Sequence, residues 1–257
     1  MRSADRRARL LEALGSGEAD VEALARRFEV SASTVRRDLQ LLSSTNAVKR
    51  TYGGAILAHP APEESLSQRQ AVNFAQKEAI ARAAADLLED EDVLILDAGS
   101  TVAALGRLLR GRRHRVITNS LPLVPLLAAE PGIELTLLGG AVRATSMSSF
   151  GPLAVEALRR LTADRLFTSA DGLVAERGLC EASLDQIALK SLMLSQAREI
   201  VVLADASKLG RGVQSYWAPL PARWTLITDD GADTGQCAAF AAAGARVIRA
   251  SVIAQAG

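Results

Sequence analysis

The sequence predicts an α/β protein with a small helical domain at the N-terminus and a larger domain built on a mostly parallel sheet. Three observations predict this class. Short helical patterns fill the first 45 residues, prolines interrupt the pattern near residue 60, and apolar runs then alternate with helical segments. The chain has 257 residues, 49% of them hydrophobic and 23% charged, which suffices for one large domain or two unequal ones and excludes a mainly disordered protein.

Several other classes are excluded by composition and spacing. No apolar run approaches the roughly 18 residues of a membrane span, and Glu12 interrupts the place where a secretory signal is apolar, so we expect a cytoplasmic protein. Cys180 and Cys237 form no CxxC pair, and His59 and His114 have no second histidine nearby. These spacings argue against disulfides, a metal site and a serine–histidine–aspartate triad, so we expect neither a metal nor a cofactor.

Charge is distributed unevenly along the chain. Residues 1–57 carry 10 lysines and arginines against 7 aspartates and glutamates, whereas residues 58–257 carry 20 against 22. The formal charge is therefore +3 in the first segment and −2 in the second. The basic segment suggests contact with a polyanion, although a solvated helical surface explains so small an excess equally well.

Three short helices are predicted before residue 45. Residues 5–15 place apolar side chains on one helical face and end at Gly15. Asp20 is positioned to cap a second helix. A third helix, capped by Ser31, runs through Ser43. Two helices separated by a short turn are the arrangement of a helix-turn-helix.

The third helix has a polar face that suits the major groove of DNA. Hydroxyls and arginines bond phosphates, and arginine also binds O6 and N7 of guanine. Apolar and polar residues then alternate on either side of Gly53 and Gly54, which predicts a β-hairpin wing. We expect Asp38 to orient Arg37 or a neighbouring arginine. An ordinary three-helix subdomain with a polar surface is the alternative. The candidate DNA-binding residues are Ser31, Ser33, Thr34, Arg36, Arg37, Gln40, Lys49, Arg50 and Tyr52.

The stretch AHPAPEESLS marks a boundary between two modules. Its two prolines and two glutamates disfavour regular structure. We therefore predict a winged helix-turn-helix domain at residues 1–57, a linker at residues 58–67 and an α/β domain at residues 68–257.

The α/β domain is predicted from a helix over residues 73–88 and a series of apolar runs. These runs lie at residues 93–97, 115–118, 133–139, 165–170, 199–205, 225–229 and 246–250. Because helical segments separate them, we expect a mostly parallel, Rossmann-like sheet that is covered on both faces.

Polar and small residues follow several of the predicted strands, at the carboxyl ends where such sheets bind ligands. Gly99 permits close backbone approach, and Ser100 and Thr101 open a helix whose free N–H groups attract an anion. Each such residue can equally be a helix cap or part of a loop salt bridge. The candidate effector-binding residues from this pattern are Asp97, Gly99, Ser100, Thr101, Asn119, Ser120, Gly139, Gly140, Asp171, Asp205 and Lys208.

The stretch VSASTVRRDLQLLSSTNAVKRTYGGA, at residues 30–55, resembles the helix-turn-helix signature of the DeoR family of bacterial transcription regulators. Residues 66–229 resemble the sugar-phosphate-sensing domain of that family, which is similar in fold to ribose-5-phosphate isomerase and glucosamine-6-phosphate deaminase. The resemblance implies that phosphate binds at Gly99, Ser100 and Thr101. It also implies four pocket residues, Asn119, Lys190, Asp205 and Lys208.

The chain departs from the family pattern at four positions. Asn46 replaces a common glycine, and Tyr52 replaces a common histidine before the paired glycines of the wing. Cys180 stands where threonine is usual, and Gln186 where glutamate is usual. A neutral amide cannot act as a carboxylate base but still bonds a hydroxyl, so the identity of the effector stays open.

The resemblance implies a repressor whose affinity for operator DNA changes when a phosphorylated sugar occupies the larger domain. A dimer or tetramer acting on repeated or inverted half-sites is expected. The competing interpretation is a sugar-phosphate isomerase or deaminase whose acid–base groups are Asp97, Asp171, Asp205 and Lys208. The basic segment and the absence of a pocket histidine argue against an enzyme. The operator, the effector, the direction of its effect and the oligomeric order stay open.

Overall fold

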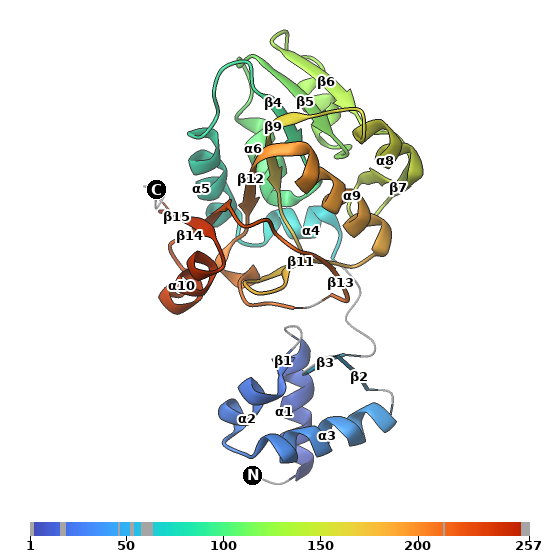
Figure 1. Ribbon diagram of the computed structural model, residues 1–257, viewed down its shortest axis with the longest axis vertical. Coiled ribbons are helices and arrows are strands. Elements are labelled where there is room, and N and C mark those ends of the chain that lie inside the picture. Colours follow the sequence, from blue (N-terminus) through green and yellow to red (C-terminus); the bar gives the residue numbers. More distant parts are fainter. Residues whose placement is uncertain are drawn as a thin grey trace. The chain divides into compact units, whose positions relative to one another are not determined.

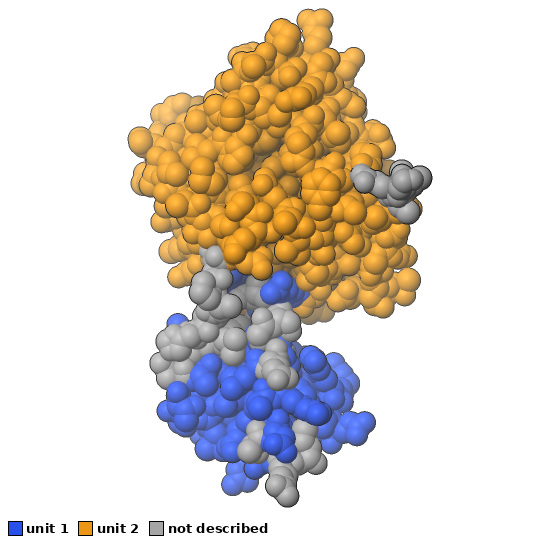
Figure 2. All heavy atoms as spheres, turned by 180° about the vertical axis from the view of Figure 1, so that it is seen from behind, with its two compact units in different colours: residues 1–63, 211–214 blue, residues 64–210, 215–257 orange. Residues whose placement is uncertain are grey.

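A computed structural model describes residues 3–15, 19–45, 47–51, 54–57, 64–212 and 214–252. The chain divides into two compact units (Figures 1 and 2). The first, which we call the head, comprises residues 1–63 and 211–214. The second, the body, comprises residues 64–210 and 215–257. None of the helices in these described ranges combines the length and apolarity that crossing a membrane requires.

The head consists of three helices and a small antiparallel sheet (Figure 1). The helices are α1 (Ser3–Gly15), α2 (Val21–Phe28) and α3 (Ala32–Ser44). The strands are β1 (Ala19–Asp20), β2 (Val48–Arg50) and β3 (Gly54–Leu57), in the order β1-β3-β2. The predicted helices and hairpin are confirmed. The short β1, which completes a three-stranded wing, was not predicted.

Two side chains fix the starts of α2 and α3. Asp20 accepts a hydrogen bond from the N–H of Glu22 at 2.7 Å, and Ser31 accepts one from the N–H of Thr34 at 3.2 Å. Both bonds satisfy N–H groups that have no partner within the helix. Glu29 ends α2 in a left-handed conformation, with φ of 53°, which turns the chain toward α3. Both predicted caps are confirmed.

The body is built around a seven-stranded sheet with the order β15-β14-β12-β9-β4-β5-β6. All six pairings are parallel. The strands are β4 (Val93–Leu96), β5 (His114–Thr118), β6 (Ile133–Leu137), β9 (Ala163–Thr168), β12 (Ala197–Leu203), β14 (Trp224–Asp229) and β15 (Ala245–Ala250). They coincide with the seven predicted runs, so the mostly parallel sheet is confirmed.

Helices cover both faces of this sheet (Figure 1). Leu94 and Leu96 of β4 pack into a core with α5 (Phe74–Ala85), α6 (Ser100–Arg107) and α7 (Leu123–Leu127). Ile95 points to the opposite face, whose core includes α8 (Pro152–Leu158), α9 (Leu184–Gln196) and α10 (Thr234–Ala242). Burying a large aliphatic side chain stabilises a fold by about 1.5–3 kcal/mol, so both cores hold the strand ends in place.

Short elements follow the carboxyl ends of several strands. The hairpin of β7 (Ala141–Arg143) and β8 (Ser148–Phe150) follows β6. A three-stranded antiparallel sheet joins β10 (Gly172–Val174), β11 (Gly178–Glu181) and β13 (Tyr216–Ala218), and the 3-10 helix η1 (Ala206–Lys208) follows β12. Before α5 lies α4 (Leu66–Ala71), which begins inside the stretch interpreted as a linker. These elements border the candidate site.

Candidate functional site

The carboxyl ends of β4, β5 and β9 bring three buried polar residues together. Thr168 donates a hydrogen bond to Oδ2 of Asp97 at 2.6 Å. The N–H of Ala98 donates to Oδ1 of Asn119 at 2.9 Å. Asp97 and Asn119 were candidates from the sequence, and the structure places them side by side because their strands are neighbours in the sheet.

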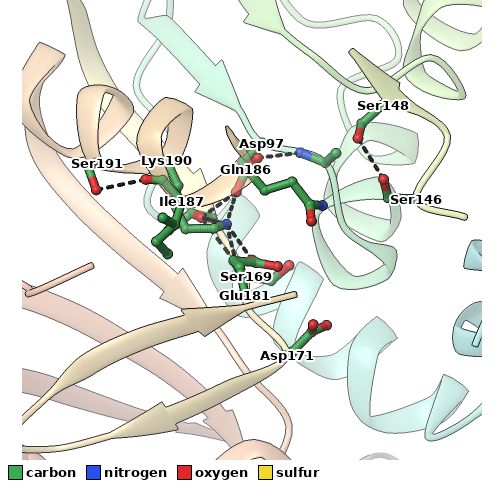
Figure 3. A network of polar contacts seen from close by, with 12 residues as sticks. Asp97, Ser146, Ser148, Ser169, Asp171, Glu181, Gln186, Ile187, Lys190 and Ser191 are labelled. Atoms are coloured by element: carbon green, nitrogen blue, oxygen red, sulfur yellow. Dashed lines mark hydrogen bonds and ion pairs between the residues drawn. The ribbon is translucent and has the colours of Figure 1, made fainter. Parts of the chain in front are cut away.

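Lys190 reaches this cluster from α9 (Figure 3). Its ammonium donates to Oδ2 of Asp97, to the carbonyl of Ser169 at 2.6 Å and to Oγ1 of Thr168 at 3.0 Å. Oε1 of Glu181 lies 3.1 Å away. An ammonium group has three protons, so these four acceptors satisfy it completely. Lys190 therefore forms part of a fixed wall rather than a free cation.

The charges of this wall shift each other's pKa. The pKa of Glu181 is raised to about 7. Burial is the largest cause, the charges of Asp171 and Asp97 act in the same direction, and Lys190 opposes them. Burial alone lowers the pKa of Lys190, but the two carboxylates outweigh that effect and raise it above its ordinary value. Lys190 therefore stays charged at neutral pH, whereas Glu181 titrates there.

The first turn of α6 opens next to this wall. Gly99 precedes it, and a Cβ at this position would lie 2.1 Å from Oγ of Ser169, so a larger residue would force the Ser169 hydroxyl to move. Among the described residues no side chain caps this helix. The N–H groups of Ser100 and Thr101 therefore lack a partner within the helix, and the positive end of its dipole adds to their attraction for an anion.

Two serines missed by the sequence prediction lie on the β7–β8 hairpin. Ser146 and Ser148 are buried, and their hydroxyl oxygens are 2.8 Å apart. Ser148 also forms an isolated bridge with Ser120, which ties the hairpin to the end of β5. In the view of Figure 3, the amide of Gln186 points away from Lys190 and toward the side of these serines. The serine–x–serine spacing after the paired glycines was the available sequence signal.

The paired glycines shape the same hairpin. Gly140 has φ of 130°, and a Cβ there would lie 2.2 Å from the carbonyl oxygen of Phe150. Gly139 is exposed at the end of β6. The structure thus gives Gly140 a role in backbone geometry.

A second polar cluster lies at η1. Asp205 accepts hydrogen bonds from the N–H of Ser207 at 3.1 Å and from the amide of Asn73 at 3.0 Å. Asp205 therefore caps η1 and links it to the start of α5. Lys208, at the end of η1, is half-buried, and its charge helps to lower the pKa of Lys77, after the larger effect of burial. Within the described ranges, no three histidine, cysteine or carboxylate side chains are arranged to hold a metal ion.

The polar face of α3 is exposed as the sequence predicted. The residues that share this exposure are Ser31, Ser33, Arg36, Arg37 and Gln40, and Lys49 of β2 is exposed too, while Thr34 is half-buried. Arg36 forms an exposed ion pair with Glu22 at 3.3 Å. No hydrogen bond or ion pair joins the side chain of Arg37 to another described residue. The side chain of Arg50 and all of Tyr52 lie outside the described residues.

The expected role of Asp38 is wrong. Asp38 lies among the buried residues of α3, and its carboxylate accepts a hydrogen bond from Arg6 of α1 at 2.6 Å. It therefore faces the interior of the head, where it joins two helices, and does not orient Arg37.

A winged helix-turn-helix with an exposed basic helix, followed by an α/β body with a polar site at its strand ends, defines a DNA-binding regulator with a separate sensor domain. Comparison with protein families agrees. Residues 6–61 match the DeoR-like helix-turn-helix domain, and residues 72–230 match the DeoR C terminal sensor domain. The chain belongs to the DeoR family of transcription regulators.

Characterised relatives are similar along most of the chain. The HTH-type transcriptional repressor GlcR of Bacillus subtilis is 37% identical over 203 residues, which cover 79% of this chain and 78% of GlcR. The transcriptional repressor AccR of Agrobacterium fabrum is 31% identical over 234 residues, covering 90% and 91%. Among solved structures, ribose 5-phosphate isomerase A of Methanocaldococcus jannaschii aligns with a TM-score of 0.40 and 23% identity over 53% of this chain and 54% of the isomerase. The family assignment rests on the sequence matches.

Proposed function

We propose that this regulator represses genes of carbohydrate metabolism, and that a phosphorylated sugar bound at the carboxyl ends of the sheet changes its affinity for operator DNA. The observation that carries the proposal is the uncapped first turn of α6 beside buried hydroxyl, amide and carboxylate groups. A phosphate suits the unpaired N–H groups, and sugar hydroxyls suit the neighbouring side chains. Repression is the role named for the relatives GlcR and AccR.

The head supplies the DNA-binding surface in this proposal. Arg37 and Gln40 of α3 reach base edges, while the hydroxyls near the start of the helix and Lys49 of the wing contact phosphates. The exposure of these side chains supports the assignment. Arg50 and Tyr52 of the wing complete the proposed surface.

The pocket residues take two kinds of role. The backbone at Gly99, Ser100 and Thr101 binds the phosphate. We assign a supporting role to Asp97, Asn119, Lys190 and Asp205. Lys190 bonds Asp97, and Asn119 accepts a hydrogen bond from the N–H of Ala98, next to Gly99. Asp205 caps η1. Lys208 adds positive charge at the pocket, and Glu181 and Gln186 face the sugar.

We also propose that the body does not catalyse a reaction. Asp97 accepts bonds from Lys190 and Thr168, and Asp205 caps η1, so neither carboxylate is free to act as a base. The protein acts in the cytoplasm as a homo-oligomer whose two or more heads occupy repeated half-sites. Robust turnover of a sugar phosphate by the purified protein would contradict this part of the proposal.

Fluorescence anisotropy tests the proposal on DNA from upstream of the protein's own gene. The full chain is titrated at fixed salt with glucose 6-phosphate, fructose 6-phosphate, ribose 5-phosphate and glycerol 3-phosphate, with inorganic phosphate as the anion control. We expect selective binding that one of the four compounds alters by about 5-fold or more. The variant Lys208→Ala is expected to keep DNA binding and lose that response. Selective binding that none of the compounds alters would contradict the effector assignment.

A further inference from the structure

The helix α4 is the first element of the body along the chain, directly after the segment that leads from the head. It spans Leu66–Ala71 and is only six residues long. Ser65 caps it, and Gln68 bonds back to the N–H of Ser65 at 2.8 Å. This capping box fixes the first turn internally. A helix so short depends on the rest of the body for its position.

The first turn of α4 is attached to the turn between β7 and β8. The N–H of Leu66 donates a hydrogen bond of 2.8 Å to the carbonyl of Thr145, across 79 positions of sequence. Thr145 immediately precedes Ser146, whose hydroxyl pairs with that of Ser148. Leu66, which begins α4, is thus hydrogen-bonded to the residue next to the buried Ser146.

Two further contacts hold the rest of α4. Arg69 lies 3.5 Å from a carboxylate oxygen of Asp171, which follows β9. Lys77 of α5 donates to the carbonyl of Arg69 and, at 2.7 Å, to that of Val72. These bonds hold the C-terminal end of α4. The hydrogen bond from the N–H of Leu66 fixes the N-terminal end of α4 to the turn between β7 and β8.

The serine pair has bonding capacity left for a ligand. Two hydroxyls that bond each other use one proton of two, and each oxygen keeps a further lone pair. A sugar hydroxyl that bonds them would shift the turn at residues 145–147 relative to β8. Because Thr145 belongs to the same turn, that shift changes the position of the carbonyl that holds Leu66.

We propose that residues 145–148 couple the pocket to the DNA-binding head, with Ser146 and Ser148 bonding the sugar and the Thr145 carbonyl moving the first turn of α4. The coupling deepens the proposed function and rests on it. The hydrogen bond that carries the coupling joins the turn beside the proposed sugar site to α4, the first helix of the body after the segment from the head.

A matched pair of variants isolates this hydrogen bond. Leu66→Pro removes the N–H and the side chain, whereas Leu66→Ala removes the side chain and keeps the N–H. Proline is favoured at the first position of a helix, and Ser65 has the extended backbone, with ψ of 158°, that a residue before proline prefers. Both variants are therefore expected to fold, as circular dichroism and the Tm of the full chain will show.

The readout is the ratio of operator Kd values with and without each of the four phosphorylated compounds. For every compound that alters DNA binding by the wild type, we expect Leu66→Ala to respond and Leu66→Pro to show a ratio within about 2-fold of one, with its sugar-phosphate Kd retained. Equal responses of the two variants would overturn the coupling. If the wild type responds to no compound, the proposed function itself fails, and the coupling fails with it.

The serine pair is tested separately by direct binding. Ser146→Ala and Ser148→Ala are each expected to weaken binding of the active sugar phosphate by about 5- to 10-fold and to leave the Kd for inorganic phosphate unchanged. Ser191→Ala is the control, because Ser191 bonds the Ile187 carbonyl of its own helix at 2.7 Å. Wild-type affinity in both pocket variants would remove the serines from the ligand site and overturn their part of the proposal.

Discussion

The head and the body use charged residues in opposite ways. In the head, the arginines of α3 are exposed; Arg36 has one exposed partner, and Arg37 has none among the described residues. In the body, Asp97, Glu181 and Lys190 are buried and bonded to one another. Exposed cations can exchange water and counterions for DNA phosphate at little cost. Buried charges cannot rearrange freely, so they serve to hold a binding site in shape.

The comparison is tested most strongly by removing Lys190. Lys190→Met leaves two buried carboxylates without their cation, and we expect the body to lose about 3–5 kcal/mol of unfolding free energy. Both tryptophans of the chain, Trp217 and Trp224, lie in the body, so their fluorescence during urea denaturation reports its unfolding.

Arg198→Met is the matched control for this change. Arg198 is 84% exposed and pairs with Asp164 at 3.6 Å. Exposed pairs contribute about 0–1 kcal/mol, so the control should stay within that range of the wild type. If both variants lose equally little, the buried charges do not support the body as we describe.

The next effect is a pH dependence that belongs to Glu181. Its pKa is raised from 4.5 to about 7 by burial. A carboxyl group whose pKa is raised in the folded state stabilises the fold when the pH is below the pKa of the unfolded chain. That contribution is lost as the pH rises to about 7. Between pH 4.5 and 7, the wild type should therefore lose about 3 kcal/mol relative to Glu181→Gln. Parallel stability curves for the two proteins over this range would show that Glu181 is not protonated preferentially in the fold.

The smallest expected effect belongs to the exposed charges of the head. Arg37→Ala should weaken operator binding by about 1–3 kcal/mol at fixed salt, without changing the Tm or the sugar-phosphate Kd. Arg198→Ala, which removes an exposed arginine from the body, should leave operator affinity unchanged. An Arg37→Ala protein that binds operator as tightly as the wild type would remove Arg37 from the DNA-binding surface.

Local signals predicted the parts of the molecule that local interactions determine. Asp20 and Ser31 could be identified as caps because each bonds N–H groups two or three residues away. The seven strands were found because each is an apolar run long enough to stand out. The strand ends of a parallel sheet meet at one edge, so Asp97 and Asn119 could be expected to approach each other.

Contacts between distant segments could not be predicted in the same way. Asp38 is acidic in a basic helix, and its partner Arg6 lies 32 positions earlier, so the sequence pointed to a neighbouring arginine. Glu181 and Ser148 lie in strands too short to show a pattern, and Ser146 lies in the turn between β7 and β8. Their roles arise from burial beside Lys190 and from the hairpin geometry, which depend on the assembled body.

The central claim is that a ligand in the body and DNA at the head change each other's affinity. Isothermal titration calorimetry of the full chain with the active sugar phosphate, in the presence and absence of saturating operator DNA, tests it directly. Linkage requires the sugar-phosphate Kd to change by the same factor by which the sugar phosphate changes the operator Kd. The account predicts equal factors of about 5 or more. A sugar-phosphate Kd that is identical with and without operator would contradict it.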